Sequence, residues 1–485
     1  MPEQNSSLSS ASQPMHRRTL LQAAGLGAGV LAAGGLAANR AAAAPGPGDP
    51  TAGALSSVDS GDGTHAADAA NSAAATGVDL PLTGGPDFPI GLFWPPHPYE
   101  TTLDRYQEIK DAGFTFLITG NYQFDPQSGG YALQMADQVG LKVLISGDPR
   151  MQAIAQYLSV NDDRSVPSSL TTADATSWVR AALTSYANHP SLAGFNVFDE
   201  PAQSRFPTVG ALTGIVRDVA PGLLPYSNLV PGNGPGYAAF VQAYIDTVKP
   251  PLISFDRYPI LTDGIDLNYF DNWAIYREAS LKSGLPAWTF IQSVGYNNHR
   301  VPTASQLAWQ TNISLAYGCK GIQYFTYWTP DPARGEGFTK ALITADGKQT
   351  PLYGAARRLN RTWLQPVGRQ LKPLHSESVQ HANDDPLPPS AVAFTPGDRL
   401  TSAAGDAVVI GLFRNTQDDG TRYLLVTNRN PDAPASVRLG VNQAHVGSVA
   451  TFEPATGRYR GAAQHGTLKV HLKAGAAALY RLSPR

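Results

Sequence analysis

Residues 193–201, Ala-Gly-Phe-Asn-Val-Phe-Asp-Glu-Pro, are the stretch from which the fold of this chain can be read. Its apolar residues predict a buried strand that ends abruptly at two adjacent carboxylates, Asp199 and Glu200, followed by Pro201. Burying an acid is costly unless the acid is paired or hydrogen-bonded. We therefore expect a parallel strand whose C-terminal end presents both acids to a ligand. The alternative is a capping pair at a strand-to-helix junction.

Predicted strands alternate with predicted helices throughout residues 87–373. Strand patterns lie at 90–94, 114–119, 142–146, 192–198, 224–229, 252–255, 287–292 and 321–327. Helical patterns follow them at 102–112, 130–139, 173–187, 208–219, 237–248, 269–283, 304–317 and 352–371. Eight such units predict an α/β fold, a (β/α)8 TIM barrel. An open doubly wound sheet usually has a glycine-rich turn after its first strand, and the segment Trp94-Pro95-Pro96-His97 is no such turn.

The pattern changes after the barrel. Residues 374–389 are proline-rich and predict a linker. Residues 390–485 contain short strand patterns at 408–413, 422–427, 435–439, 449–453 and 468–472, separated by turn residues. This spacing predicts a C-terminal all-β sandwich domain.

The N-terminal region predicts export. Arg17 and Arg18 precede a weakly hydrophobic Ala/Gly/Leu run and a small-residue cleavage site at 41–44, which resembles a twin-arginine (Tat) signal peptide over residues 1–44. A non-cleaved anchor is the alternative, but the run is short and glycine-rich. Residues 45–86 are rich in Ala, Gly, Ser and Pro and predict a disordered linker. We therefore expect a secreted, extracellular protein.

Composition narrows the possible partners. The net charge of −2 and the charged fraction of 15% do not indicate a basic surface that would bind nucleic acid. Cys319 is the only cysteine, so no disulfide forms within the chain. No stretch after the leader predicts a membrane span in the mature protein, and the histidines show no zinc-ligand spacing. The sequence does not indicate an oligomeric state.

Polar and aromatic residues lie at the predicted C-terminal strand ends, where TIM barrels carry their active sites. Besides the two acids of the fourth strand, they are Trp94, Asn121, Asp148, Asp256, Tyr258, Gln292, Tyr327 and Trp328. Acids suit proton transfer, flat rings suit stacking on sugars, and amides suit hydroxyl groups. This set predicts a carbohydrate substrate, and its chemistry requires no metal or organic cofactor. Alternatively, Asp148 forms a turn, and the two tryptophans pack at the barrel rim.

Three segments resemble barrel glycoside hydrolases of the large retaining clan, including beta-galactosidase-type members with an all-β C-terminal module. They are the fourth-strand motif, the run 318–325 (GCKGIQYF) and the tail 343–348 (ITADGK) leading to Tyr353 and Asn360. The resemblance covers the barrel and, more loosely, the sandwich. It implies that Glu200 is the acid/base residue. The clan usually has Asn before that glutamate, where this chain has Asp199.

The seventh strand departs from the clan. The clan places its nucleophilic glutamate there, whereas this chain has Gln292, which cannot ionise. Three mechanisms follow. In the first, Asp256 is the partner of Glu200, either as a nucleophile or, as we prefer, as the base of an inverting reaction. In the second, Asp199 orients a substrate acetamido group. In the third, the site binds sugar without cleaving it. Glu336, in a long loop, is a further candidate for the second carboxylate.

We therefore predict a secreted glycoside hydrolase that cleaves O-glycosidic bonds of an oligo- or polysaccharide by general acid catalysis with a carboxylate pair. Adjacent carboxylates repel ionisation, so we expect one of them to serve as a proton donor near neutral pH. Alternatively, Asp256 simply pairs with Arg257. The alternative function is a non-catalytic carbohydrate- or cell-envelope-binding protein on a degenerate barrel.

Overall fold

The computed structural model describes residues 80–161, 169–461 and 466–485. The predicted signal peptide and nearly all of the first predicted linker lie outside the described residues.

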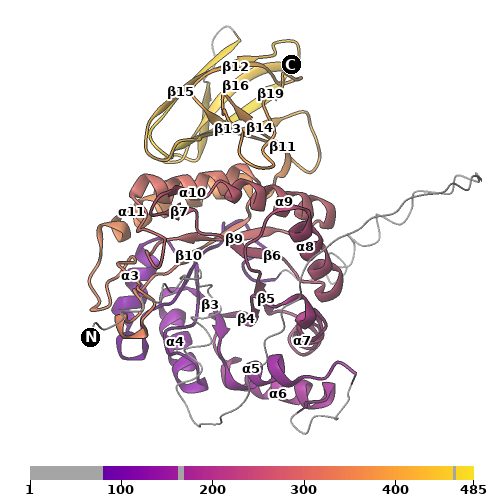
Figure 1. The fold of residues 1–485 in the computed structure, drawn as a ribbon, viewed down its shortest axis with the longest axis vertical. Coiled ribbons are helices and arrows are strands. Elements are labelled where there is room, and N and C mark those ends of the chain that lie inside the picture. The colour runs from indigo at the N-terminus through magenta and orange to yellow at the C-terminus, as the bar shows by residue number, and fades with distance from the viewer. Residues whose placement is uncertain (1–79, 162–168, 462–465) are drawn as a thin grey trace, which may run out of the picture.

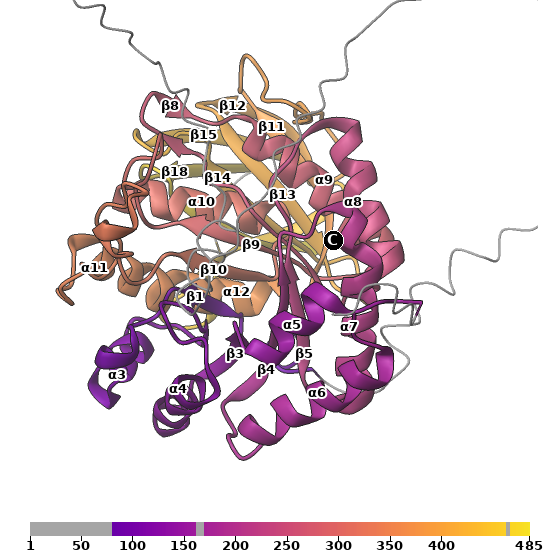
Figure 2. The same ribbon diagram turned by 60° about the horizontal axis from the view of Figure 1, so that its bottom comes forward.

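Eight parallel strands form the barrel, which confirms the predicted fold class (Figures 1 and 2). They are β1 (Ile90–Phe93), β2 (Phe116–Ile118), β3 (Lys142–Ser146), β4 (Leu192–Asp199), β5 (Leu224–Asn228), β6 (Ile253–Asp256), β9 (Ala287–Gln292) and β10 (Gly321–Phe325). The hydrogen-bonded order is β5-β4-β3-β2-β1-β10-β9-β6. A parallel bridge between Leu229 and Phe255 joins the two ends of this order and closes the ring.

Helices surround the barrel (Figure 2). They are α3 (Leu103–Asp111), α4 (Pro126–Val139), α5 (Pro149–Tyr157), α6 (Thr172–Tyr186), α7 (Phe206–Val219), α8 (Gly234–Val248), α9 (Asn268–Ser283), α10 (Ala304–Ala316), α11 (Pro351–Leu359) and α12 (Gln365–Leu371). Short 3-10 turns lie at η1 (Pro98–Glu100), η2 (Gln203–Arg205) and η3 (Pro332–Arg334). The predicted last helix is interrupted by a π-helical turn, η4 (Asn360–Leu364).

Side-chain caps begin several of these helices. Asp125, Thr171 and Thr303 each accept a hydrogen bond from a backbone amide of the first turn and close a capping box. Such caps satisfy amides that have no partner within the helix. Helix α5 was not predicted from the sequence.

The C-terminal domain is a sandwich of two antiparallel sheets, as predicted (Figure 1). Its strands are β11 (His375–Ala382), β12 (Leu400–Gly405), β13 (Val408–Arg414), β14 (Arg422–Asn428), β15 (Ala435–Val441), β16 (Val446–Glu453), β17 (Arg458–Gly461), β18 (Thr467–Leu472) and β19 (Ala477–Pro484). The sheet orders are β11-β13-β14-β19-β16-β17 and β12-β15-β18. The prediction of a linker over 374–389 was wrong for residues 375–382, which pair with β13 as edge strand β11. The neighbouring prolines hid this strand in the sequence.

The larger sheet of the sandwich is buried on both faces. Val408 and Ile410 face the core of the sandwich, whereas Val409 and Phe413 belong to the apolar cluster of the barrel. On the barrel side, helix α10 contacts the sandwich. The indole Nε1 of Trp309 on this helix donates to the carbonyl oxygen of Arg429 (3.0 Å). The two domains therefore share one continuous apolar core.

Candidate active site

Strained backbone marks the C-terminal mouth of the barrel. Trp94, Asn121, Tyr122 and Glu200 have φ values of +62°, +50°, +70° and +49°. These residues follow β1, β2 and β4, where the sequence predicted functional residues. L-residues rarely adopt this conformation, and such strain is concentrated at functional sites.

Glu200 is held at the mouth by its own backbone. Its amide donates to the carbonyl oxygen of Asn228 on β5 (2.9 Å), and its side chain is buried, with 2% of the residue exposed. A bulge in β4 between Asn196 and Phe198 shifts the register just before the acidic pair. Asp199 is half-buried as the last residue of β4 and lies opposite Asn228 in the register.

Asp256 ends β6 and is equally buried, with 2% exposed. The Asn228 amide donates to its Oδ1 atom (2.9 Å), and the Tyr258 hydroxyl donates to its Oδ2 atom (3.2 Å). The hydroxyl of Ser254 donates to the Asn228 Oδ1 atom (2.9 Å), which orients that amide toward Asp256. Asn228 thus binds Glu200 through its backbone and Asp256 through its side chain.

Tyr296, which the sequence analysis missed, packs against Tyr258, the tyrosine whose hydroxyl donates to Asp256. Burial raises the pKa of its phenol well above its usual range, and the charges of Asp256 and Glu200 raise it further. Asp199 is not among the groups that act on this phenol. The charges of the two carboxylates that we predicted as a catalytic pair therefore both act on one buried phenol.

A tight turn places Tyr296. Its backbone exchanges hydrogen bonds with His299 (2.9 and 2.8 Å) across Asn297 and Asn298, and Asn297 adopts a φ of +48°. Asparagine tolerates this conformation better than most residues. The Asn-Asn pair soon after the seventh predicted strand was the signal in the sequence that this loop turns sharply.

Aromatic rings line the barrel side of the mouth. Tyr258 stacks on Phe325 at 4.8 Å, and Phe325 stacks on Phe93 at 6.1 Å. These rings limit the contact of water with the Asp256 carboxylate. The predicted site residue Tyr258 therefore contacts Asp256 directly.

The opposite side of the mouth is covered by the loop after β10. The Arg334 guanidinium lies 5.2 Å from the Trp94 ring and forms two hydrogen bonds with Glu336 (2.9 and 3.1 Å). Asn121 donates to the carbonyl oxygen of Pro95 (2.7 Å) and so links the loops after β1 and β2. Glu336 is therefore committed to an ion pair, and Trp94 is covered by Arg334.

Gln292 has a structural role. Its amide nitrogen donates to the carbonyl oxygens of Ile260 (3.0 Å) and Arg300 (2.7 Å), and its amide oxygen accepts from the Ile260 amide (2.9 Å). The side chain is fully buried and joins the end of β9 to the loop after β6. No amide hydrogen remains for a sugar, so the expected substrate contact is replaced by this loop-binding role.

Asp148 is likewise occupied. It caps α5 and binds Arg150 (2.7 Å) and the Tyr186 hydroxyl (2.7 Å). Burial alone would raise its pKa, but the hydrogen bonds from Arg150 and Tyr186 outweigh burial and lower the pKa. These contacts agree with the turn-forming alternative, and a substrate contact by Asp148 stays a prediction.

Tyr327 and Trp328 pack outside the barrel. Tyr327 meets Phe114 edge-on at 5.8 Å, and Trp328 lies 5.2 Å from the guanidinium of Arg105 on α3. Both rings are buried, with 0% and 2% exposed. This packing agrees with the rim-packing alternative for Trp328, and a substrate contact by either residue stays a prediction.

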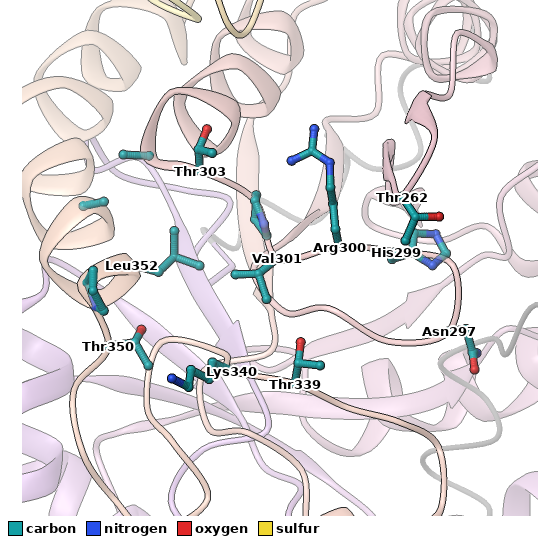
Figure 3. Close-up of a pocket in the computed structure, with 14 residues that line it drawn as sticks. Thr262, Asn297, His299, Arg300, Val301, Thr303, Thr339, Lys340, Thr350 and Leu352 are labelled. Atoms are coloured by element: carbon teal, nitrogen blue, oxygen red, sulfur yellow. The ribbon is translucent and has the colours of Figure 1, made fainter.

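A separate cavity of about 720 Å³ lies beside this site (Figure 3). Segment 299–304, the loop at Thr339 and Lys340, and the start of α11 line it. Its lining contains neither proposed catalytic carboxylate. Over the described ranges, no cluster of three His, Cys, Asp or Glu residues could hold a metal ion. None of the described helices is long and apolar enough to cross a bilayer.

No protein-family model matches this sequence, and no curated protein matches it either. Among solved structures, the chain is similar to a β-glucuronidase from Ruminococcus gnavus, with 12% identity, a TM-score of 0.39, and coverage of 56% of this chain and 49% of that chain. It is also similar to a protein described as a glycoside hydrolase, with 12% identity, a TM-score of 0.46, and coverage of 81% and 92%. The chain spans about half the length of the R. gnavus enzyme. At these scores the likeness does not extend to activity or substrate.

Proposed function

We propose that this protein is a glycoside hydrolase in which Glu200 is the general acid and Asp256 the second carboxylate. One observation carries the proposal: two buried acids at the barrel mouth are joined through Asn228 and act on the same phenol. Burying acids is expensive, and buried acids are concentrated at catalytic sites. Asp256 is bound by an amide and a phenol and not by Arg257, which pairs with Asp266 (2.7 Å).

The spacing of the strands favours inversion. Glu200 follows β4 and Asp256 ends β6; these strands are separated by β5 alone, and two strand spacings amount to about 9–10 Å. Inverting enzymes hold their carboxyl groups about 6.5–9.5 Å apart, which leaves room for a water molecule. Glu200 would protonate the glycosidic oxygen while Asp256 takes a proton from the water. The water oxygen then bonds to the anomeric carbon as the bond to the leaving group breaks.

The sequence analysis also suggested two other mechanisms for this site. Asp199, half-buried at the end of β4 and opposite Asn228, would in the second mechanism orient a substrate acetamido group. Non-catalytic sugar binding is favoured by one observation, the structural use of Gln292 where the clan has its nucleophile. Export through the Tat route is part of the proposal, and it predicts that a double Arg17→Lys, Arg18→Lys variant stays in the cytoplasm.

A panel of 4-nitrophenyl glycosides and polysaccharides tests the proposal. Wild-type protein should hydrolyse at least one of them, and Glu200→Gln and Asp256→Asn should each lower kcat/KM by about 10²–10⁴-fold. Glu278→Gln on the exposed face of α9 is the matched control and should keep the wild-type rate. The first-formed anomer, read by proton NMR, should be inverted.

The other outcomes are equally specific. Retention of configuration would discard inversion but keep the pair, with Asp256 as the nucleophile. Full activity in Glu200→Gln would overturn its assignment. Saturable sugar binding with no turnover on any substrate would favour the non-catalytic alternative.

A further inference from the structure

The cavity beside the barrel mouth has the size of a small-molecule site. Its volume of about 720 Å³ lies within the range of about 300–1,000 Å³ that is usual for ligand pockets. Most of its lining comes from residues 299–304 after β9, from Thr339 and Lys340 after β10, and from the start of α11 (Figure 3). The proposed reaction does not use this cavity, because neither of its two carboxylates lines it.

The walls of the cavity are mainly apolar. The apolar residues that line it are Val301, Pro302, Ala304, Pro351, Leu352 and Ala355. Two lining threonines add little polarity, because their hydroxyls already donate within the protein. The Thr339 hydroxyl donates to the carbonyl oxygen of Gly295 (3.1 Å), and the Thr350 hydroxyl donates to that of Ala341 (2.8 Å). A sugar has several hydroxyl groups that need hydrogen bonds, so these walls suit an apolar group better.

Two cations line the cavity, and no acid lies beside them. Arg300 and Lys340 belong to different loops, and the lining contains neither Asp nor Glu. Arg334 in the loop after β10 binds Glu336 (2.9 Å), whereas Arg300 and Lys340 bind no carboxylate within the described part of the chain. Positive charge without a compensating acid in a recess of low polarity attracts an anion.

The protein holds Arg300 in place and leaves some of its donors for a ligand. Its Nε atom donates to the carbonyl oxygen of Leu261 (3.0 Å), and its Nη1 atom donates to the Gln306 side chain (2.6 Å). Its Nη2 atom has no partner among the described residues. A guanidinium that is already fixed loses little freedom on binding, and its remaining N–H groups suit a carboxylate. The first residues of α10 and α11 also line the cavity, and helix N-termini favour negative charge.

We propose that this cavity binds a small amphipathic anion, an apolar ring that carries one carboxylate. The carboxylate would bind Arg300 and Lys340, and the ring would pack on the apolar residues at the starts of α10 and α11. The inference goes beyond the proposed function and does not depend on it, because the cavity and the barrel mouth are lined by different residues.

Calorimetric titration of the full chain with 2-naphthoate tests the inference. The wild type should bind one equivalent saturably. Uncharged 2-naphthylmethanol should bind at least about 10-fold more weakly, since it lacks the charge-assisted hydrogen bonds of the carboxylate. Inorganic sulfate should also bind at least about 10-fold more weakly, because it has no apolar part to bury against the walls.

Variants of the lining locate the ligand. Lys340→Gln should weaken 2-naphthoate binding about two- to fivefold, and Arg300→Gln should weaken it at least about 10-fold. Ala304→Trp adds a large side chain at the exposed start of α10 and should weaken binding at least about 10-fold by filling the cavity. Lys282→Gln, on the exposed face of α9, is the matched control and should keep the wild-type affinity. Glu200→Gln should also keep it.

Several results would overturn the inference. They are the absence of saturable binding by the wild type, and equal affinities for 2-naphthoate and its uncharged analogue. Wild-type affinity in both Lys340→Gln and Ala304→Trp would also overturn it, whether or not Arg300→Gln folds. Loss of binding in Glu200→Gln would place the ligand in the barrel mouth instead. None of these results bears on the glycosidase proposal, which the hydrolysis panel tests separately.

Discussion

Asn228 lies between the two buried acids and contacts both. Its carbonyl oxygen accepts from the Glu200 amide, and its side-chain amide donates to Asp256. Ser254 holds that amide in the donating orientation. An asparagine is required here, because an acid of the same size would place a third negative charge against Asp256.

Asn228→Asp should therefore impair both folding and rate. The variant loses a buried hydrogen bond and adds charge repulsion, so the free energy of unfolding should fall by about 1–3 kcal/mol. We expect kcat/KM to fall at least about 10-fold, measured beside urea unfolding. Asn442→Asp, on the sandwich, is the control for the same chemical change. Unaltered kinetics in Asn228→Asp would show that Asp256 does not depend on this amide.

Gln292→Glu restores the residue that the clan carries on its seventh strand. It would remove the donors to Ile260 and Arg300 and place a negative charge at a fully buried position. We expect the variant to be less stable by at least about 1–3 kcal/mol and to gain no activity. Thermal unfolding and the nitrophenyl panel measure both effects. A stable variant with raised activity would place this side chain in the catalytic mouth instead.

Loops, more than strands, complete the mouth of the barrel. The turn after β9 contributes Tyr296, and the loop after β10 contributes Arg334 over Trp94. The Arg334 and Glu336 side chains are only 7% and 6% exposed, so this ion pair is protected from solvent. Breaking a buried pair leaves one charge uncompensated, which costs far more than losing an exposed pair.

Glu336→Gln should loosen the loop after β10. We expect the amides of residues 331–338 to exchange hydrogen about 10-fold faster, equivalent to about 1.4 kcal/mol of local stability. Hydrogen exchange followed by mass spectrometry gives the measurement. Glu453→Gln, whose partner Arg460 is 69% exposed, is the control and should leave exchange unchanged. Equal exchange rates in both variants would mean that the buried pair does not hold this loop.

The two domains meet around a buried histidine. His381 of β11 contacts Asp384 (2.8 Å) through Nδ1 and the Tyr317 hydroxyl (3.0 Å) through Nε2. Arg429 also binds Asp384 (2.8 Å), and the ring of Phe270 meets His381 edge-on at 5.0 Å. Burial lowers the pKa of His381, and Asp384 offsets only part of that effect.

This histidine should make stability depend on pH. In the unfolded chain, His381 binds a proton as the pH falls through about 6.5, whereas the folded protein binds it only at lower pH. The unfolded state therefore binds more protons in that window, and the free energy of unfolding should decrease as the pH falls from 7.5 to 5.5. His381→Gln should reduce this dependence, as measured by urea unfolding at each pH. An identical pH dependence in the variant would assign the effect to other groups.

The shared core makes the barrel and the sandwich one structural unit. Val409, Leu425 and Leu479 of the sandwich belong to the same apolar cluster as the barrel strands. The second face of their sheet packs on a separate cluster within the sandwich. The sandwich therefore also stabilises the barrel side that carries α10.

The sequence by itself determined the architecture and the acidic pair. Eight apolar runs with following helical periods specify a parallel barrel, because local patterning and strand propensity act over a few neighbouring residues. The position of Glu200 and Asp256 at strand ends follows from the same local pattern. These features do not depend on contacts between distant segments.

Only the tertiary structure decided which polar residues face the mouth. Gln292, Asp148, Tyr327 and Trp328 lie at strand ends, yet hydrogen bonds and packing with distant loops and helices occupy them. Tyr296 enters the site through a turn whose course depends on its contacts with Phe338 and Tyr258. Side-chain direction at a barrel rim results from long-range packing, which a one-dimensional pattern does not contain.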